Sequence, residues 1–336
     1  MTIYSVARET TNGSFKQNGI PLLPHGFRGM WADAWFVDYD HGSDSNTGDR
    51  PNRALKYLDT ALNSSHCTSD DVIYVRPRGA NESGGDPNST TMGTSANAIV
   101  RQGCEGITIV GTHPGSLAGA GVPGHMAHRT YIGGHASAAA TVPIIEIRAP
   151  YCTIENLSFR HKNGDTTITD NGSVYVHGGV GASYEAFGTV IANCLFRFNE
   201  GDDGNASIYN LDSWYMDVMH CYFYRCEVGI GMRGIQTVCR GLNATNCTFQ
   251  GVTGERACDI MVYGGSSAYI NVHGCHFAAA PTDTGPTGAG DYIYMTSATG
   301  VSIQGCYFDV ADAAAELTAD GDAVDGPNYD GGGFVA

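Results

Sequence analysis

The chain has 336 residues, a net charge of −16 at pH 7, 46 glycines and 18 tyrosines. This mixture favours a turn-rich β protein, and the length fits either two average domains or one elongated one. Because a negative field repels nucleic acid and anionic membrane surfaces, we expect neither as a partner. No stretch approaches the roughly 18 consecutive apolar residues that span a membrane.

The 11 cysteines are odd in number and form no CxxC pair. Their spacing argues against zinc ribbons and disulfide scaffolds. The first 15 residues lack an apolar secretion signal. We therefore expect folding in a reducing cytoplasm, with the cysteines kept as thiols.

Residues 1–34 are predicted to form a docking segment. Within them, residues 19–27 read GIPLLPHGF, which is apolar between proline and glycine but has no period. A segment that is apolar yet cannot build its own core usually docks on another surface. We therefore expect residues 1–34 to bind a partner protein.

Residues 35–70 are predicted to form an entry strand, a polar turn and a cap helix. The apolar residues within 54–62 recur at helical spacing, so this helix can cover the open end of a stack of strands. The turn offers oxygen ligands that suit Ca²⁺, although a cluster of Asx turns is the interpretation that we favour. The side chains concerned are Asp38, Asp40, Asp44 and Asn46.

Residues 71–308 contain a repeat in which an alternating strand is followed by a turn residue, a small apolar residue, any residue and Phe. Its six copies are 153–159, 190–196, 217–223, 243–249, 271–277 and 302–308. The turn position is restricted to Asn, His and Gly, the residues that best accept left-handed backbone geometry. The pattern predicts stacked coils about 4.8 Å apart, in which like side chains lie over like.

Alternation within each copy assigns the faces of the coil. The inward column is predicted to be Ile154, Ile191, Val218, Ala244, Val272 and Ile303. The outward column is predicted to be Thr153, Val190, Asp217, Asn243, Asn271 and Ser302. Cysteine recurs after the turn, and because Leu157 occupies the same column we interpret these thiols as core packing.

Residues 309–336 carry seven acidic residues and no basic one, among many alanines and glycines. This composition is typical of an extended tail or a cap at the end of the stack.

The turn at 42–51 reads G-S-D-x-N-x-G-x-x-P, and a strand follows at 71–75. This segment resembles the entry segment of pectate-lyase-like right-handed parallel β-helix proteins, and the likeness in architecture extends over residues 35–308. Phage tailspike-like virion and decoration proteins are the members that it resembles most. The resemblance implies an all-β fold, a single-stranded right-handed parallel β-helix (solenoid) with an N-terminal cap helix.

Members of this superfamily act on acidic or decorated polysaccharides, so two kinds of site residue were sought. A glycosidase needs two carboxylates about 5–9.5 Å apart, and the candidates are Asp217, Glu227, Asp202 and Asp203. We favour their interpretation as solvated turn acids. The rings that can stack on sugars beside them are Trp214, Tyr215, Tyr222 and Tyr224.

These features together predict a bacteriophage virion protein, a tailspike-like capsid decoration protein without catalysis. We expect a parallel homotrimer that uses the outward rings of Tyr222 and Tyr307 and binds the major capsid protein or another virion protein through residues 1–34. No cofactor is expected beyond a structural Ca²⁺. Two alternatives remain: a receptor-binding tailspike that binds or depolymerises a host-surface glycan, and a cytoplasmic polysaccharide lyase or glycoside hydrolase.

Overall fold

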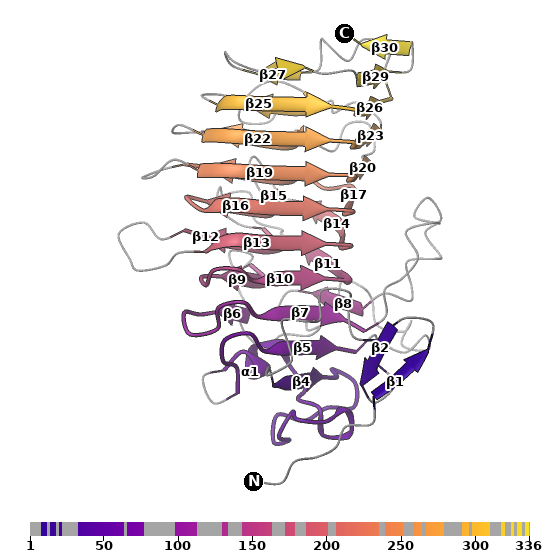
Figure 1. The fold of residues 1–336 in the computed structure, drawn as a ribbon, viewed down its shortest axis with the longest axis vertical. Helices are drawn as coiled ribbons and strands as arrows, with labels where there is room; N and C mark the ends of the chain where they lie inside the picture. The colour runs from indigo at the N-terminus through magenta and orange to yellow at the C-terminus, as the bar shows by residue number, and fades with distance from the viewer. Residues whose placement is uncertain are drawn as a thin grey trace.

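The computed structural model is almost entirely β structure, with strands stacked along one long axis (Figure 1). The residues that it describes are 8–11, 14–17, 20–21, 33–63, 66–76, 98–112, 130–133, 143–162, 172–178, 186–200, 206–234, 239–250, 258–263, 267–278, 291–295, 298–309, 317–319, 324–325, 328–330 and 333–335.

Three sheets run along this axis, and their strands recur in the same order from coil to coil. The sheet that faces the viewer in Figure 1, here the front sheet, contains β4 (Ala34–Val37), β5 (Val72–Val75), β7 (Thr108–Gly111), β10 (Thr153–Glu155), β13 (Phe187–Ala192), β16 (Trp214–Met219), β19 (Cys239–Thr245), β22 (Ser267–His273), β25 (Ala298–Gln304) and β28 (Val324–Asp325). All of its pairings are parallel, from β4 with β5 to β25 with β28.

Two further sheets run along the same axis. The second sheet contains β8 (Thr130–Gly133), β11 (Leu157–Lys162), β14 (Leu195–Glu200), β17 (Tyr222–Tyr224), β20 (Thr248–Gln250), β23 (His276–Ala278), β26 (Tyr307–Phe308), β29 (Asn328–Asp330) and β30 (Gly333–Val335). The third sheet contains β6 (Ala98–Val100), β9 (Ile145–Ile147), β12 (Val174–His177), β15 (Ala206–Leu211), β18 (Val228–Arg233), β21 (Cys258–Tyr263), β24 (Ile293–Met295) and β27 (Leu317–Ala319). The parallel β-helix arrangement expected from the repeat is therefore confirmed.

The register between coils is the one that the repeat predicts. Ile154 pairs with Ile191, and Ile191 pairs in turn with Val218. The predicted inward column is buried throughout. The predicted turn column has positive φ at every member, with Asn156 at 58°, Asn193 at 53°, His220 at 53°, Asn246 at 51°, Gly274 at 63° and Gly305 at 63°.

A ladder of phenylalanine rings runs through the core beside the buried thiols. Neighbouring rings have centroids 4.7 to 5.1 Å apart and planes within 9° of parallel, in the order Phe159, Phe196, Phe223, Phe249, Phe277 and Phe308. All the cysteines are free and buried, as expected of core filler. Burial raises the pKa of the Cys152 thiol to about 12, which keeps it protonated.

The helix predicted at 54–62 is shorter in the structure, which corrects that prediction. A 3₁₀ turn, η1 (Pro51–Arg53), precedes a single helical turn, α1 (Leu58–Ala61). The intervening chain is extended because the Leu55 backbone bonds to Phe36 and Asp38 and bridges to Val37. Leu55, Leu58, Ala61 and Leu62 are nevertheless buried in the main core. The role of α1 as a cap stays a prediction.

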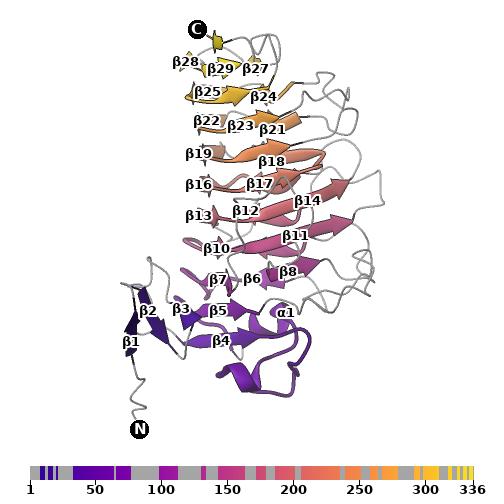
Figure 2. The same cartoon turned by 90° about the vertical axis from the view of Figure 1, so that its right-hand side faces the viewer.

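The two ends of the chain also carry strands (Figure 2). Near the N-terminus, β1 (Arg8–Thr11), β2 (Ser14–Gln17) and β3 (Ile20–Pro21) form an antiparallel sheet, while residues 22–32 lie outside the described residues. At the other end, β27, β28 and β29 pair in parallel with the coil before them, and β30 turns back antiparallel on β29. The acidic C-terminal segment thus contributes a further coil.

Candidate functional site

The acidic residues predicted as a catalytic pair lie on different sheets. Asp217 is half-buried on β16 of the front sheet, and its Oδ1 accepts a hydrogen bond of 2.7 Å from Asn243 Nδ2. Glu227 is buried directly before β18 of the third sheet. The chain turns two corners of the coil between Asp217 and Glu227. The structure therefore does not place them on one face. Asp202 and Asp203 lie outside the described residues.

The four predicted sugar-stacking rings divide into an exposed pair and a covered pair. Trp214 and Tyr215 begin β16 and are exposed. Tyr222 is buried, contrary to the expectation that it points outward into solvent, because it packs against Leu195 and its hydroxyl donates to Gln250. Tyr224 is half-buried and packs against Tyr222 and Leu195.

A column of residues with left-handed backbone conformation (positive φ) lies near the start of the front-sheet strands. The sequence analysis missed this column. Its members are Asp70, Gly106, Tyr151, Gly188, Tyr215, Gly241, Tyr269 and Gly300, with φ between 56° and 74°. The strand register places them side by side from coil to coil. From Tyr151 onward, tyrosine and glycine alternate. We call Tyr151, Tyr215 and Tyr269, with the glycines between them, the tyrosine strip.

Steric contact explains why tyrosine and glycine alternate. A Cβ atom on Gly188 would lie 2.7 Å from Cδ1 of Tyr151, and one on Gly241 would lie 2.7 Å from Cδ1 of Tyr215. The rings of Tyr151 and Tyr215 therefore fill the space above the glycine of the next coil, while a Cβ on Gly300 would lie in ordinary contact with Tyr269, at 3.5 Å. Positive φ suits glycine but strains tyrosine, so three tyrosines here are unusual.

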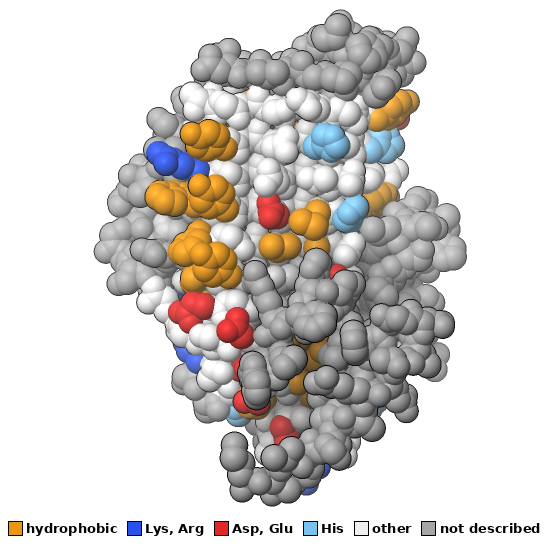
Figure 3. Space-filling view, in the orientation of Figure 1, with side chains coloured by type: hydrophobic (Ala, Val, Ile, Leu, Met, Phe, Trp, Pro, Cys, Tyr) orange, Lys and Arg blue, Asp and Glu red, His pale blue; other side chains and the backbone are white. Residues whose placement is uncertain are grey.

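The rings of the strip remain open to solvent. Tyr151 is 50% exposed, Tyr215 59% and Tyr269 65%. Figure 3 shows apolar side chains gathered along this edge of the front sheet. Two further aromatic rings extend the edge: Phe187 meets Tyr151 edge-on at 4.8 Å, and Trp214 lies 5.5 Å below the Arg240 guanidinium.

Polar side chains run parallel to the strip on the same face. They stand two residues further along each strand, and alternate residues of a strand share a face. This is the outward column predicted from the repeat, and its polar members are Thr153, Asp217, Asn243, Asn271 and Ser302. Rings and hydrogen-bonding groups therefore form two adjacent lines along the molecule.

A hollow of about 510 Å³ adjoins the Tyr151 end of the strip, lined by Ser69, Asp70, Glu105, Gly106 and Tyr151. Ser69 Oγ donates to Glu105 Oε2 at 2.6 Å, and the Gly103 amide donates to Oε1 at 2.8 Å. These hydrogen bonds lower the pKa of Glu105, so it is a carboxylate at neutral pH. The hollow is in the size range of small-ligand sites.

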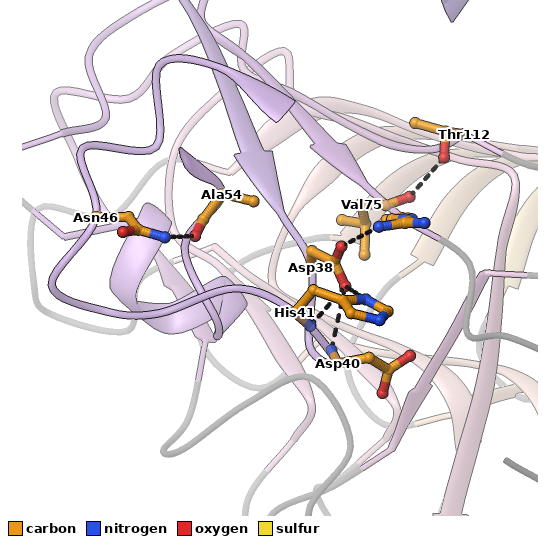
Figure 4. A network of polar contacts seen from close by, with 8 residues as sticks. Asp38, Asp40, His41, Asn46, Ala54, Val75 and Thr112 are labelled. Carbon is orange, nitrogen blue, oxygen red and sulfur yellow. Dashed lines mark hydrogen bonds and ion pairs between the residues drawn. The ribbon is translucent and has the colours of Figure 1, made fainter. Parts of the chain in front are cut away.

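Asp38, the first of the predicted calcium ligands, has protein partners for both carboxylate oxygens (Figure 4). Oδ1 accepts from the backbone amides of Asp40 and His41, each at 3.1 Å, and Oδ2 accepts from Arg76 at 2.5 Å. Burial alone would raise the pKa of Asp38, but the hydrogen bonds from Arg76 and the His41 amide outweigh it and hold the pKa below its ordinary value. The Arg76 guanidinium thus supplies the positive charge beside this carboxylate.

Of the other three predicted ligands, Asp40 contacts Asp38 through its backbone amide, and Asp44 and Asn46 have partners elsewhere. Asp44 Oδ1 accepts from the amides of Lys56 and Tyr57 at 3.1 and 3.3 Å, while Asn46 Nδ2 donates to the Ala54 carbonyl at 2.8 Å. No three acidic, histidine or cysteine side chains converge as metal ligands within the described ranges. Asp38 makes the contacts of an Asx turn, whereas Asp44 and Asn46 tie the turn to the segment at residues 54–57. The calcium site stays a prediction.

Comparison with known proteins identifies no family: no family model and no curated protein matches the chain. Among solved structures, a rhamnogalacturonan lyase is similar over 82% of this chain and 73% of its own, at 11% identity and a TM-score of 0.42. A Geobacillus virus E2 protein, ORF18, is similar over 95% of this chain and 66% of its own, at 11% identity and a TM-score of 0.34.

A GH136 lacto-N-biosidase from Eubacterium ramulus is similar over 88% of this chain and 67% of its own, at 12% identity and a TM-score of 0.27. Likenesses this distant carry no argument about function, and the fold stands on the strand pairing of this chain. Within the described residues, no helix has the length and apolar character needed to cross a membrane.

Proposed function

We propose that the chain is a structural protein of a bacteriophage particle, built as a tailspike-like right-handed parallel β-helix and carried on the capsid as a decoration protein. The observation that supports it most is the unbroken stacking of the core, in which each Phe ring from Phe159 to Phe308 lies on the next at 4.7 to 5.1 Å. Such a body is rigid and presents an ordered outer face. Its outward acid Asp217 is bonded to an amide, which suits a structural surface.

The proposal includes assembly as a parallel homotrimer that docks on another virion protein through residues 1–34. Tyr307 is exposed and is available to such an interface, whereas Tyr222 is buried. Light scattering of the purified chain should give three times the monomer mass of 35.5 kDa. A monomer both in solution and on the particle would contradict the trimer.

Particle composition tests the virion role. Phage particles are purified by density gradient from lysed cells that carry the gene, and the chain is quantified by mass spectrometry against a capsid protein and a tail protein. Many copies per particle, on the scale of the capsid protein, support a decoration protein. Recovery of the chain in the soluble lysate alone contradicts the proposal.

A second function is favoured by the tyrosine strip: a receptor-binding tailspike that binds a host-surface glycan. It predicts few copies per particle, located at the tail. If that protein also depolymerises the glycan, Asp217 is the acid that lies on the same face as the strip, and Asp217→Ala should abolish the release of reducing ends. Full cleavage by this variant would remove Asp217 from consideration.

A further inference from the structure

We infer that the tyrosine strip is a binding platform for an extended, uncharged polysaccharide that runs along the axis of the β-helix. The juxtaposition that carries this inference is a line of exposed rings beside a line of hydroxyl, amide and carboxylate groups, with a polar hollow at one end. It deepens the second function proposed above, on which it rests for the class of ligand, and it does not depend on the virion role.

The spacing of the rings matches a repeating ligand. Tyr151, Tyr215 and Tyr269 stand two coils apart, which at about 4.8 Å per coil places a ring about every 9.6 Å. Two sugar residues of an extended chain cover about the same length. A polysaccharide with a disaccharide period can therefore present an equivalent sugar face to each ring in turn.

The surface between the rings is low and flat. Gly188 and Gly241 place no side chain there, and the rings themselves cover them. A polymer can therefore lie across successive coils without meeting a projecting side chain in this column. Aromatic rings suit the apolar C–H faces of sugars because they offer large, rigid contact areas at a low entropic cost.

Hydrogen-bonding groups for the sugar hydroxyls stand beside the rings. Asn243, Asn271 and Ser302 follow the strip at two residues' distance along their strands, on the same face. The hollow at the Tyr151 end adds Ser69 and Glu105. Both lines run in the direction of the stack, as one polymer would require.

Charge selects an uncharged ligand. The chain carries a net charge of −16, and the hollow is lined by Asp70 and Glu105, while the Arg240 guanidinium beside the strip lies over the Trp214 ring. A polyuronate would be repelled by these carboxylates, whereas sugar hydroxyls can donate to them. The ligand of the strip is therefore a neutral glycan.

Affinity gel electrophoresis of the full chain tests the inference, with hydroxyethylcellulose, galactomannan and dextran as neutral probes and polygalacturonate as the anionic one. At least one neutral polymer should retard the chain, and polygalacturonate should not. The test variants are Tyr215→Gly and Tyr269→Gly, because the same column already holds glycine at positive φ. Each should weaken binding about fivefold, the loss expected for one aromatic contact.

Two further variants guard against misreading. Tyr215→Asn also tolerates positive φ and should match Tyr215→Gly, while Tyr307→Ala removes an exposed ring of the second sheet and should bind normally. Thermal unfolding verifies that these four variants, and the double variant described next, fold.

Failure of every neutral polymer to retard the chain overturns the inference, and so does unchanged binding by the double variant Tyr215→Gly/Tyr269→Gly. If these substitutions instead dissociate an oligomer in the absence of glycan, the strip is an interface between copies and the inference is wrong. Particle composition is measured separately, so its outcome and this one can be told apart.

Discussion

Replacing Phe223 by alanine should destabilise the protein more than an equivalent change at the end of the phenylalanine ladder. Phe223 is buried and stacks on Phe196 at 5.1 Å and on Phe249 at 4.7 Å. Removing a buried Phe costs about 3–5 kcal/mol. Each aromatic pair adds about 0.5–1.5 kcal/mol beyond burial, so we expect a loss near the upper end, about 5 kcal/mol.

Phe159 is the matched control, because it is equally buried but stacks on one ring of the ladder, Phe196 at 5.0 Å, and pairs with Ile132 on the other side. Phe159→Ala should cost about 1 kcal/mol less than Phe223→Ala, the contribution of one aromatic pair. Urea denaturation followed by far-UV circular dichroism gives both free energies of unfolding. A loss below about 1 kcal/mol for Phe223→Ala, or a larger loss for Phe159→Ala, refutes the reasoning.

Three further predictions concern the turn, the buried acids and the thiols. Asn246→Val should destabilise the protein by about 1–2 kcal/mol and Asn246→Gly by less, because residue 246 has φ of 51°; equal urea midpoints would contradict this. Burial raises the folded pKa of Asp38 and Glu146, but their hydrogen bonds lower it by more, so the net shift is downward. The ionised carboxylates therefore stabilise the fold above pH 4.5, and this contribution is lost on further acidification. Asp38→Asn should flatten the acid limb of the urea midpoint, and an unchanged slope would count against the assignment. Burial raises the pKa of Cys152 and Cys239 to about 12, so Ellman's reagent at pH 8 should label them only after unfolding; rapid labelling of the native chain would show them accessible.

The coil register was predictable because two columns admit few residue types. The turn column holds only Asn, His and Gly, and the Phe column is invariant over six copies, so any other alignment would break both. Burial, positive φ and ring stacking then followed from the strand period.

The tyrosine strip was not predictable in the same way. Tyrosine is a poor marker of positive φ, and the residues of this column stand just before the repeated segment, where tyrosine alternates with glycine. The signal becomes visible only when every second coil is compared, because the rings of Tyr151 and Tyr215 leave room only for glycine in the next coil. A search for one recurring residue type misses such a two-coil period.

Local pattern was misleading where contacts with other segments decide the outcome. Helical spacing at 54–62 predicted one helix, but the bridge between Leu55 and Val37 holds part of that segment extended. Alternation placed Tyr222 outward, yet Leu195 and Gln250 from neighbouring coils cover its ring. Sequence spacing also brought Asp217 and Glu227 together, although two corners of the coil separate them.

Disulfide cross-linking of the outward column tests the coil register, on which the core ladders, the tyrosine strip and both proposals depend. Asn243 and Asn271 are direct partners on β19 and β22, whereas Ser302 lies one coil beyond Asn271. Paired strands are about 4.8 Å apart, within the Cα separation that a disulfide spans. The double variant Asn243→Cys/Asn271→Cys should therefore form a cross-link under mild oxidation, detected by peptide mass spectrometry, and Asn243→Cys/Ser302→Cys should not. A cross-link in the second variant and none in the first would contradict the register.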